Sequence, residues 1–281
     1  GGMLIIGVTA ILFPLFLVVM HYFFVPITIV YSVTYEVGII LFTFLSFGLL
    51  GLYDDLKKTF FWEKELFFGL RLRHKLFVEI VLAFIIGSLL YYGLGIDILH
   101  IPFFGVWKLG VWFIPFAAFT IVAFTNAYNI TDGLDGLAAG VLVIALIAFW
   151  VISASILDTP LSVFIALWVG SLLAFLYFNI YPARIFLGDV GALSFGATFA
   201  VIGLILGKIL AIVIIGGIFI LEVSTSLAQL LSKRFLKKKV MKVAPLHLWL
   251  QHKGWDEPKV VMRFWILNIM FAVVGLWFAF F

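Results

Sequence analysis

Five aspartates stand in three short segments, each beside a long apolar run: Asp54, Asp55, Asp132, Asp135 and Asp189. Adjacent carboxylates such as Asp54 and Asp55 repel one another, so they are stable only beside a cation or with a bound proton. Carboxylates from separate segments suit Mg²⁺, which takes few protein carboxylates and completes its shell with phosphate and water oxygens. Nearby lysines and arginines can neutralise a diphosphate. If the three segments meet, the acids therefore predict a Mg²⁺-dependent enzyme that acts on a phosphate substrate.

Each acidic segment also has a purely structural explanation. The Asp54–Asp55 pair can be a solvated helix end, and Asp132 and Asp189 can each cap a following helix. Capping leaves other polar residues of the second segment without a role: Asn126, Asn129 and Asp135. The three segments taken together therefore favour a functional site over three unrelated helix ends.

The composition indicates what positions these residues. The chain has 281 residues, of which 65% are hydrophobic and only 11% are charged. A soluble domain of this length needs more polar surface, so the lipid bilayer is its natural solvent. A helix needs roughly 20 apolar residues to cross the bilayer. This predicts one all-α, polytopic integral membrane domain over residues 1–281, with nine spans near 4–24, 37–53, 76–94, 111–129, 137–156, 161–180, 190–207, 209–231 and 260–280.

The distribution of basic residues predicts the orientation. Lysines and arginines gather in residues 54–75 and 232–259, whereas the connections on the other side offer only Lys108 and Lys208. The positive-inside rule places the two basic loops in the cytoplasm, and some of their charge serves this orientation and the attraction of anionic lipids. With nine spans, all five aspartates then face the cytoplasm, the N-terminal end lies inside and the C-terminal end outside. The break near Gly207–Lys208 separates the seventh span from the eighth.

Other features narrow the chemistry. The chain has no cysteine, which excludes disulfides and thiolate metal sites. His247 and His252 are five residues apart and do not share a helical face, so a histidine metal pair is not predicted. Their segment is typical of an amphipathic interfacial piece anchored by Trp249 and Trp255, from which His247 can still reach a phosphate. No nucleic-acid partner is expected.

In this order, the motifs resemble the polyprenyl-phosphate N-acetylhexosamine-1-phosphate transferases over nearly the whole chain. The most specific is the run from Asn126 to Leu137, and Phe186–Asp189 and the tail from Pro245 support it. The resemblance implies a ten-helix enzyme of the bacterial inner (plasma) membrane that uses Mg²⁺, a UDP-linked amino sugar and undecaprenyl phosphate, and releases UMP. The most similar branch transfers phospho-N-acetylmuramoyl-pentapeptide to give lipid I for peptidoglycan synthesis. A homodimer is compatible with this resemblance.

The resemblance also implies residue roles. Asp54 and Asp55 match the pair beside the lipid phosphate, one of which is a proposed general base, and Asp189 matches the magnesium ligand. His247 joins these as a catalytic residue. The substrate-binding residues that it implies are Lys75, Asn126, Asn129, Asp132, Asp135, Asn179 and Phe186. Phe186 is expected to stack on uracil, and Lys75 or its neighbour Arg73 to line the pyrophosphate site.

Some alternatives stay open. The most similar branch usually carries three consecutive histidines where this chain has His247–Leu248–Trp249, so a UDP-N-acetylglucosamine donor is an alternative. A membrane transporter is the alternative from another class, although transporters usually place acids near the midplane, and only Glu79 and Glu222 fall within spans here. Direct attack and a covalent aspartyl intermediate are both compatible with the sequence. Because family members have one more helix and a Thr-Pro-Thr-Met element before the pair matched by Gly1–Gly2, we expect upstream residues to be missing.

Overall fold

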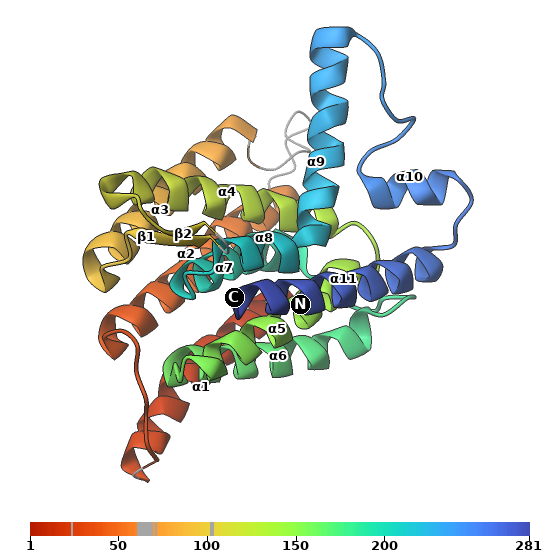
Figure 1. Ribbon diagram of the computed structural model, residues 1–281. Coiled ribbons are helices and arrows are strands. Elements are labelled where there is room, and N and C mark those ends of the chain that lie inside the picture. Colours follow the sequence, from red (N-terminus) through yellow and green to blue (C-terminus); the bar gives the residue numbers. More distant parts are fainter. Residues whose placement is uncertain (24, 61–69, 71, 102–103) are drawn as a thin grey trace.

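A computed structural model describes residues 1–23, 25–60, 70, 72–101 and 104–281 (Figure 1). Two basic residues of the first loop predicted to be cytoplasmic, Lys64 and Arg71, lie outside these described residues. The α-helices are α1 Gly2–Tyr22, α2 Val33–Phe60, α3 Leu72–Leu94, α4 Phe113–Thr131, α5 Leu137–Ser155, α6 Thr159–Asn179, α7 Gly188–Ile205, α8 Ile209–Ile215, α9 Gly217–Leu231, α10 Leu246–His252 and α11 Glu257–Ala279. A 3₁₀ turn at Gly110–Trp112 precedes α4, and a π-helical turn at Ser232–Leu236 extends α9.

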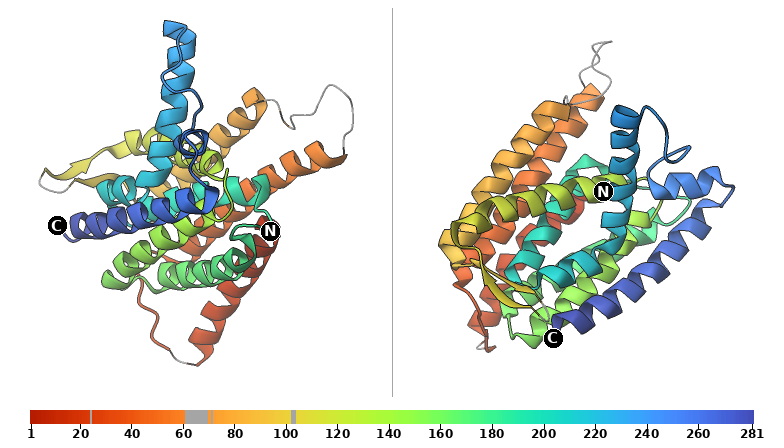
Figure 2. Two further views of the ribbon diagram at one scale, coloured as in Figure 1. Left: turned by 90° about the vertical axis from the view of Figure 1, so that its right-hand side faces the viewer. Right: turned by 45° about the horizontal axis from the view of Figure 1, so that its top comes forward.

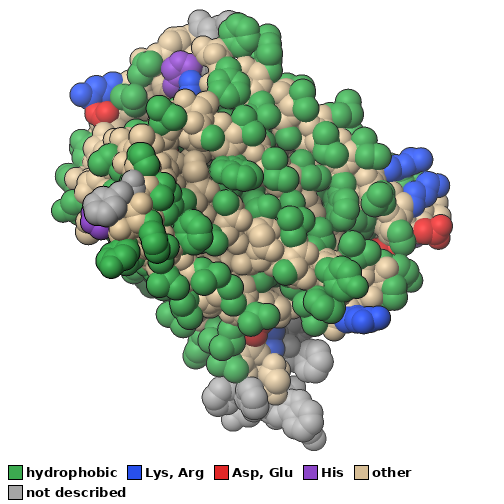
Figure 3. Space-filling model, turned by 90° about the horizontal axis from the view of Figure 1, so that it is seen from below, with side chains coloured by type: hydrophobic (Ala, Val, Ile, Leu, Met, Phe, Trp, Pro, Cys, Tyr) green, Lys and Arg blue, Asp and Glu red, His purple; other side chains and the backbone are tan. Residues whose placement is uncertain are grey.

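Within the described ranges, eight helices are long and apolar enough to cross a membrane, or nine if α8 and α9 count as one bent span. The prediction of a polytopic helical membrane protein is therefore confirmed. Apolar side chains cover most of the surface seen in Figure 3, with lysines, arginines and acids near its margins. Large apolar side chains such as Ile11, Phe16 and Phe119 are exposed on α1 and α4. Such a surface suits lipid rather than water.

The predicted span 209–231 is not one straight helix. Although α7 ends near the predicted break, with Gly207 at a φ of +66°, the chain also bends by 74° between α8 and the helix Gly217–Leu236. A Cβ on Gly216 would lie 2.6 Å from the Phe124 ring, so the glycine lets that ring pack against the bend. As a result α9 runs across the other helices, and its C-terminal end projects from the bundle (Figure 1).

A short β-hairpin was not part of the predicted all-α fold. Strand β1 (Ile98–Ile101) pairs antiparallel with β2 (Gly105–Lys108), with Ile98 opposite Lys108. Lys108 also lies 3.3 Å from the Asp97 carboxylate. Four-residue strands are too short to give a clear alternating pattern in the sequence, which explains why they were missed. The hairpin connects α3 to α4 at the end of the bundle away from Asp54.

Helix α7 is the central element that positions the acids. All of its residues from Val190 to Ile205 are buried, and α1, α2 and α4 pack around it. Small residues along α7 allow the neighbouring helices to approach closely. Around them, Phe44, Trp168 and Phe195 form edge-to-face and stacked ring contacts. The position of Asp189, in the first turn of α7, is therefore set by the core of the protein.

The bundle has two distinct ends. We call the end that contains residues 54, 132 and 189 the site end, and the end that contains the β-hairpin the far end. The left view of Figure 2 places the two chain termini at opposite ends of the bundle. The link from α4 to α5 and the link from α6 to α7 meet at the site end, where the backbone N–H of Gly136 donates to Asn179 Oδ1 at 3.1 Å.

Candidate active site

Two lysines and two aspartates from three helices form one ionic cluster at the site end. Lys58 Nζ lies 3.0 Å from Asp54 Oδ2 and 2.9 Å from Asp189 Oδ2. Lys75 Nζ lies 3.4 and 2.7 Å from the same two oxygens. Asp54 is only 2% exposed, and its Oδ1 also accepts the backbone N–H of Leu70. Two carboxylates that are 135 positions apart in the sequence thus share two cations.

Asp55 binds the N-terminus of α7. Its Oδ1 accepts the backbone N–H of Asp189 at 3.2 Å, and its Oδ2 accepts that of Val190 at 3.1 Å. A carboxylate here satisfies free helix N–H groups and interacts favourably with the helix dipole. Gly188 has a φ of +75°, and a Cβ there would lie 2.7 Å from Asp55 Oδ2, so glycine is required. One residue of the predicted catalytic pair therefore holds the backbone of the predicted metal ligand.

A cavity of about 290 Å³ opens beside this cluster. It brings together six of the predicted site residues: Asn129, Asp132, Asp135, Asn179, Phe186 and Asp189. The Phe186 side chain is 66% exposed, which leaves a ring face free to stack on a planar ligand. The cavity thus combines an aromatic ring with polar walls next to four charged groups.

The cavity walls are tied together by two of these residues. Asp135 Oδ2 accepts the backbone N–H of Ala183 at 2.9 Å, and Glu257 Oε1 accepts the N–H of Asp135 at 2.7 Å. Asn179 accepts from Gly136 as described above and also donates to the Ile185 carbonyl at 2.9 Å. Asp135 and Asn179 therefore hold three separate segments in register.

Among the described residues, Asp132 differs from the other four aspartates because its carboxylate makes no hydrogen bond or ion pair. It follows the last turn of α4, where its N–H donates to the Tyr128 carbonyl at 3.0 Å, so it does not cap the next helix. Burial raises the pKa of the Asp132 carboxyl to about 7, and the negative charge of Asp189 adds to this effect. The C-terminal end of a helix also disfavours an anion. Asp132 therefore changes its charge close to neutral pH.

Asn126 lies deeper than predicted. Its side-chain amide donates to Glu79 Oε2 at 2.7 Å and to the Val122 carbonyl at 3.0 Å, and it is not among the residues that line the cavity. Glu79 is 1% exposed and stands one helical turn after Lys75 on α3. Asn126 thus supports a buried acid below the ionic cluster.

His247 packs behind the loop between α4 and α5. Its Nδ1 lies 2.9 Å from Glu222 Oε2, and its backbone N–H donates to Glu222 Oε1 at 3.1 Å. A Cβ on Gly133 would lie 2.5 Å from His247 Nε2, so the ring rests directly on this loop. His252 is exposed on the other side of α10. The structure therefore connects only the first histidine to the cavity wall.

Sequence reasoning missed four residues that shape this end of the protein: Lys58, Glu79, Glu222 and Glu257. Lys58 follows Asp54 by one helical turn, a spacing that brings opposite charges together. Glu79 and Glu222 are buried acids within apolar helices, which are costly unless they have partners. These signals were present in the sequence, but the partners that give them meaning come from distant segments.

The donor set around Asp189 fits Mg²⁺ when phosphate supplies the remaining oxygens. Within the described part of the chain, no group of three or more His, Cys, Asp or Glu side chains could hold a metal ion. Mg²⁺ is commonly bound by one or two carboxylates together with substrate phosphates and water. Asp54 and Asp189 direct one oxygen each at the same two lysine ammonium groups. The space between these carboxylates therefore already accommodates positive charge.

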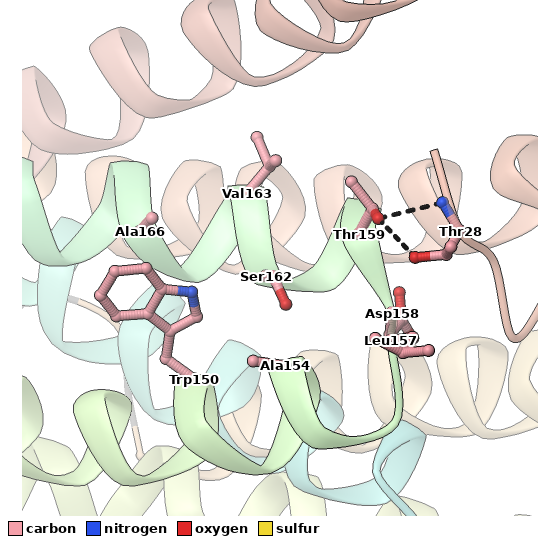
Figure 4. Close-up of a pocket in the computed structure, with 9 residues that line it drawn as sticks. All are labelled: Thr28, Trp150, Ala154, Leu157, Asp158, Thr159, Ser162, Val163 and Ala166. Carbon is pink, nitrogen blue, oxygen red and sulfur yellow. Dashed lines mark hydrogen bonds between the residues drawn. The ribbon is translucent and has the colours of Figure 1, made fainter. Parts of the chain in front are cut away.

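A second cavity lies at the far end (Figure 4). It measures about 250 Å³ and is mainly apolar, with Thr159 Oγ1 bonded to the backbone N–H and the hydroxyl of Thr28 at 3.1 and 2.9 Å. None of the predicted site residues lines it. The site-end cavity is accordingly the candidate active site.

Comparisons with known proteins agree with this assignment. A family model described as "Glycosyl transferase family 4" matches residues 37–207. The phospho-N-acetylmuramoyl-pentapeptide-transferases of Borreliella afzelii (strain PKo) and Borrelia hermsii (strain HS1 / DAH) are 37% and 38% identical to the chain over 257 residues, which cover 85% of this chain and 72% of each relative. The protein of the same name from Clostridium novyi (strain NT) is 35% identical over 245 residues, 86% of this chain and 74% of the relative. The chain therefore belongs to glycosyl transferase family 4, alongside the phospho-N-acetylmuramoyl-pentapeptide-transferases.

Proposed function

We propose that this protein transfers phospho-N-acetylmuramoyl-pentapeptide from its UDP donor to undecaprenyl phosphate, giving lipid I and UMP at the cytoplasmic face of the bacterial plasma membrane. The observation that carries the proposal is the cluster of Asp54, Lys58, Lys75 and Asp189 beside the cavity at which Phe186 is exposed. The two lysines of the cluster can neutralise phosphate charge, and its carboxylates can hold a divalent cation. Relatives at 35–38% identity bear the name of this activity.

The charges of the cluster explain how a diphosphate is bound. Phosphoryl transfer asks the protein mainly to position the reactants and to stabilise negative charge. The Lys58 and Lys75 ammonium groups, now shared between two carboxylates, can turn to donor phosphate oxygens while Phe186 stacks on the uracil. Asp189 would hold Mg²⁺, which supplies positive charge to the donor diphosphate when bound.

The two aspartates at the end of α2 take different roles in this scheme. Asp55 binds the backbone of α7, so it keeps Asp189 in place. Asp54 faces the lysines and is the member of the pair placed to orient the acceptor phosphate. We propose direct in-line attack by the acceptor. A covalent aspartyl intermediate would instead release UMP from the donor in the absence of undecaprenyl phosphate, so UMP release without acceptor distinguishes the two routes.

A second candidate differs only in the donor sugar. His247–Leu248–Trp249 replaces the three histidines expected for the pentapeptide branch, which keeps UDP-N-acetylglucosamine as an alternative donor. The test is to incubate the purified protein with undecaprenyl phosphate and each UDP-sugar, with and without Mg²⁺, and to measure UMP and the lipid product. We expect UMP only with Mg²⁺ and the muramoyl-pentapeptide donor. If UDP-N-acetylglucosamine is turned over and the muramoyl-pentapeptide donor is not, the second candidate is correct. If neither donor is turned over, both candidates are rejected.

The cytoplasmic orientation has a separate test. The chain has no cysteine, so single cysteines report without background labelling. Lys237, after the end of α9, and Val106, in the hairpin, are both exposed. In intact cells, an impermeant maleimide should label Val106→Cys but not Lys237→Cys. The reverse pattern would place the candidate active site outside the cell and reject the proposed orientation.

A further inference from the structure

Glu222 and His247 form a buried pair outside the ionic cluster. Their side chains are 0% and 1% exposed, respectively. One carboxylate contacts two different nitrogen atoms of the same histidine, the ring Nδ1 at 2.9 Å and the backbone N at 3.1 Å. Since Glu222 lies within α9, an apolar helix, its charge is costly there unless both oxygens have partners. The two contacts provide one partner for each oxygen.

This arrangement selects one form of the neutral imidazole ring. An ionised carboxylate can only accept hydrogen bonds, and the backbone N–H can only donate. Nδ1 must therefore carry the ring hydrogen in order to bond Glu222 Oε2. In a neutral imidazole, the other nitrogen then has a free lone pair. The pair thus makes Nε2 a hydrogen-bond acceptor.

Nε2 is directed at the loop that lines the candidate active site. It lies so close to Gly133 that a Cβ there would be only 2.5 Å away. Gly133 lines the cavity together with Asp132 and Asp135. Among the described residues, no side chain or backbone group makes a hydrogen bond to Nε2. Two acids are close to this ring in the chain or in space. Asp132 directly precedes Gly133 in the loop, and Glu222 contacts the ring from α9.

We infer that Glu222 is a positioning residue that holds neutral His247 with its ring hydrogen on Nδ1, so that Nε2 accepts a hydrogen bond from a hydroxyl or amide N–H of the donor substrate at the 132–136 loop. The inference rests on the proposed function, because it assigns the donor substrate to this cavity. It differs from the sequence-based prediction that His247 reaches a phosphate, since a neutral Nε2 without hydrogen cannot donate to phosphate oxygens.

Glu222→Gln tests the inference with almost no change of shape. An amide has one accepting oxygen, and the fixed backbone N–H of His247 requires it. The amide NH₂ group then faces Nδ1, which must become the acceptor, so the ring hydrogen moves to Nε2. The substitution therefore converts Nε2 from an acceptor into a donor while both hydrogen bonds to residue 222 remain.

The tautomer can be read from ¹⁵N NMR of histidine-labelled protein at a pH at which the ring is neutral. The chain has five histidines, and His247→Gln identifies the signal by its disappearance. We expect the hydrogen on Nδ1 in the unsubstituted protein and on Nε2 in Glu222→Gln. Glu36→Gln is the matched control, because Glu36 is another fully buried glutamate in a helix and lies toward the far end. This control should leave the His247 signal unchanged. Hydrogen on Nε2 in the unsubstituted protein would overturn the inference.

A double-mutant cycle separates positioning from general support of the fold. If Glu222 acts through His247, Glu222→Gln should lower kcat by about 10-fold or more, and should have no further effect once His247→Gln is present. Multiplicative losses, or an unchanged kcat in Glu222→Gln, would contradict the inference. If no UDP-sugar is turned over, the proposed function fails, while the NMR result still decides the tautomer.

Discussion

At Gly51, α2 runs directly against the backbone at the start of α7. A Cβ at this position would lie 2.1 Å from the Asp189 carbonyl oxygen and 2.6 Å from the Val190 nitrogen, whereas ordinary contacts begin at 3.4 Å. These neighbours are backbone atoms and cannot rotate away as a side chain can. Gly51→Ala should therefore force α2 and the start of α7 apart by more than 1 Å.

Such a shift reaches the site through Asp55 and Lys58, which stand one and two turns further along α2. Asp55 holds the N–H groups of Asp189 and Val190 at 3.2 and 3.1 Å, so the shift breaks both hydrogen bonds. Overpacking of this kind costs about 1–3 kcal/mol, and loss of the helix cap costs about 1 kcal/mol more. Because a misplacement of 1 Å can reduce catalysis by about 100-fold, we expect a loss of that order in UMP release.

The assay is Mg²⁺-dependent UMP release by purified Gly51→Ala, together with its thermal unfolding in the same detergent. Gly38→Ala is the matched control, since Gly38 is on the same helix and a Cβ there meets nothing within 4 Å. The control should keep its activity and be slightly more stable, because alanine favours a helix by roughly 0.5–1 kcal/mol over glycine. Normal turnover and an unchanged melting temperature in Gly51→Ala would refute the packing of α2 on α7 described above.

Three further predictions follow from the same structure. Gly133→Ala would bring a Cβ to 2.5 Å from His247 Nε2, so the ring and the 132–136 loop must move apart, and UMP release should fall by about 10-fold or more, whereas Gly170→Ala, which has open space around it, should not lower it. Because the raised pKa of Asp132 means that folding takes up a proton between about pH 4 and 7, this group's contribution to stability falls as pH rises through 7. In melting curves with EDTA, Asp132→Asn should therefore gain more stability relative to the unsubstituted protein at pH 8 than at pH 5; equal differences at both values would contradict the assigned environment. Asp158→Ala removes the carboxylate that accepts the Leu161 N–H at the start of α6, so it should cost about 1 kcal/mol of stability at the far end without loss of UMP release at saturating substrate, and a large loss of turnover would argue against this separation.

The membrane fold was largely predictable because lipid imposes a simple rule. Each crossing must satisfy its own backbone hydrogen bonds, so long apolar runs give helices of nearly fixed length. The bend after α8 was not predictable from the same runs, because hydropathy measures how apolar a segment is and not its direction. The ring of Phe124 beside Gly216 determines that bend, and this contact depends on the packing of α4.

The candidate site was predictable in part. The acidic segments meet at one end of the bundle, and the structural alternative of a solvated end does not fit Asp54, which is 2% exposed. The sequence predicts Lys58 only as part of a basic loop, because its proximity to Asp189 depends on how α2 packs on α7. The pairing of His247 with Glu222 was missed for a similar reason, since 25 residues and the end of α9 separate them. Sequence patterns identified the groups, while helix packing determined their partners.

The most direct test of the central claim is divalent-cation binding at Asp189. Mn²⁺ can replace Mg²⁺ as a probe, and electron paramagnetic resonance measures how much of it is bound in the presence of the UDP-linked donor. Asp97→Asn is the control, because it removes an acid that lies just before the far-end hairpin and pairs with Lys108. We expect one Mn²⁺ per chain in the unsubstituted protein and in Asp97→Asn, and none in Asp189→Asn. Equal binding by all three proteins would contradict the assignment of this cluster as the site of phosphate transfer.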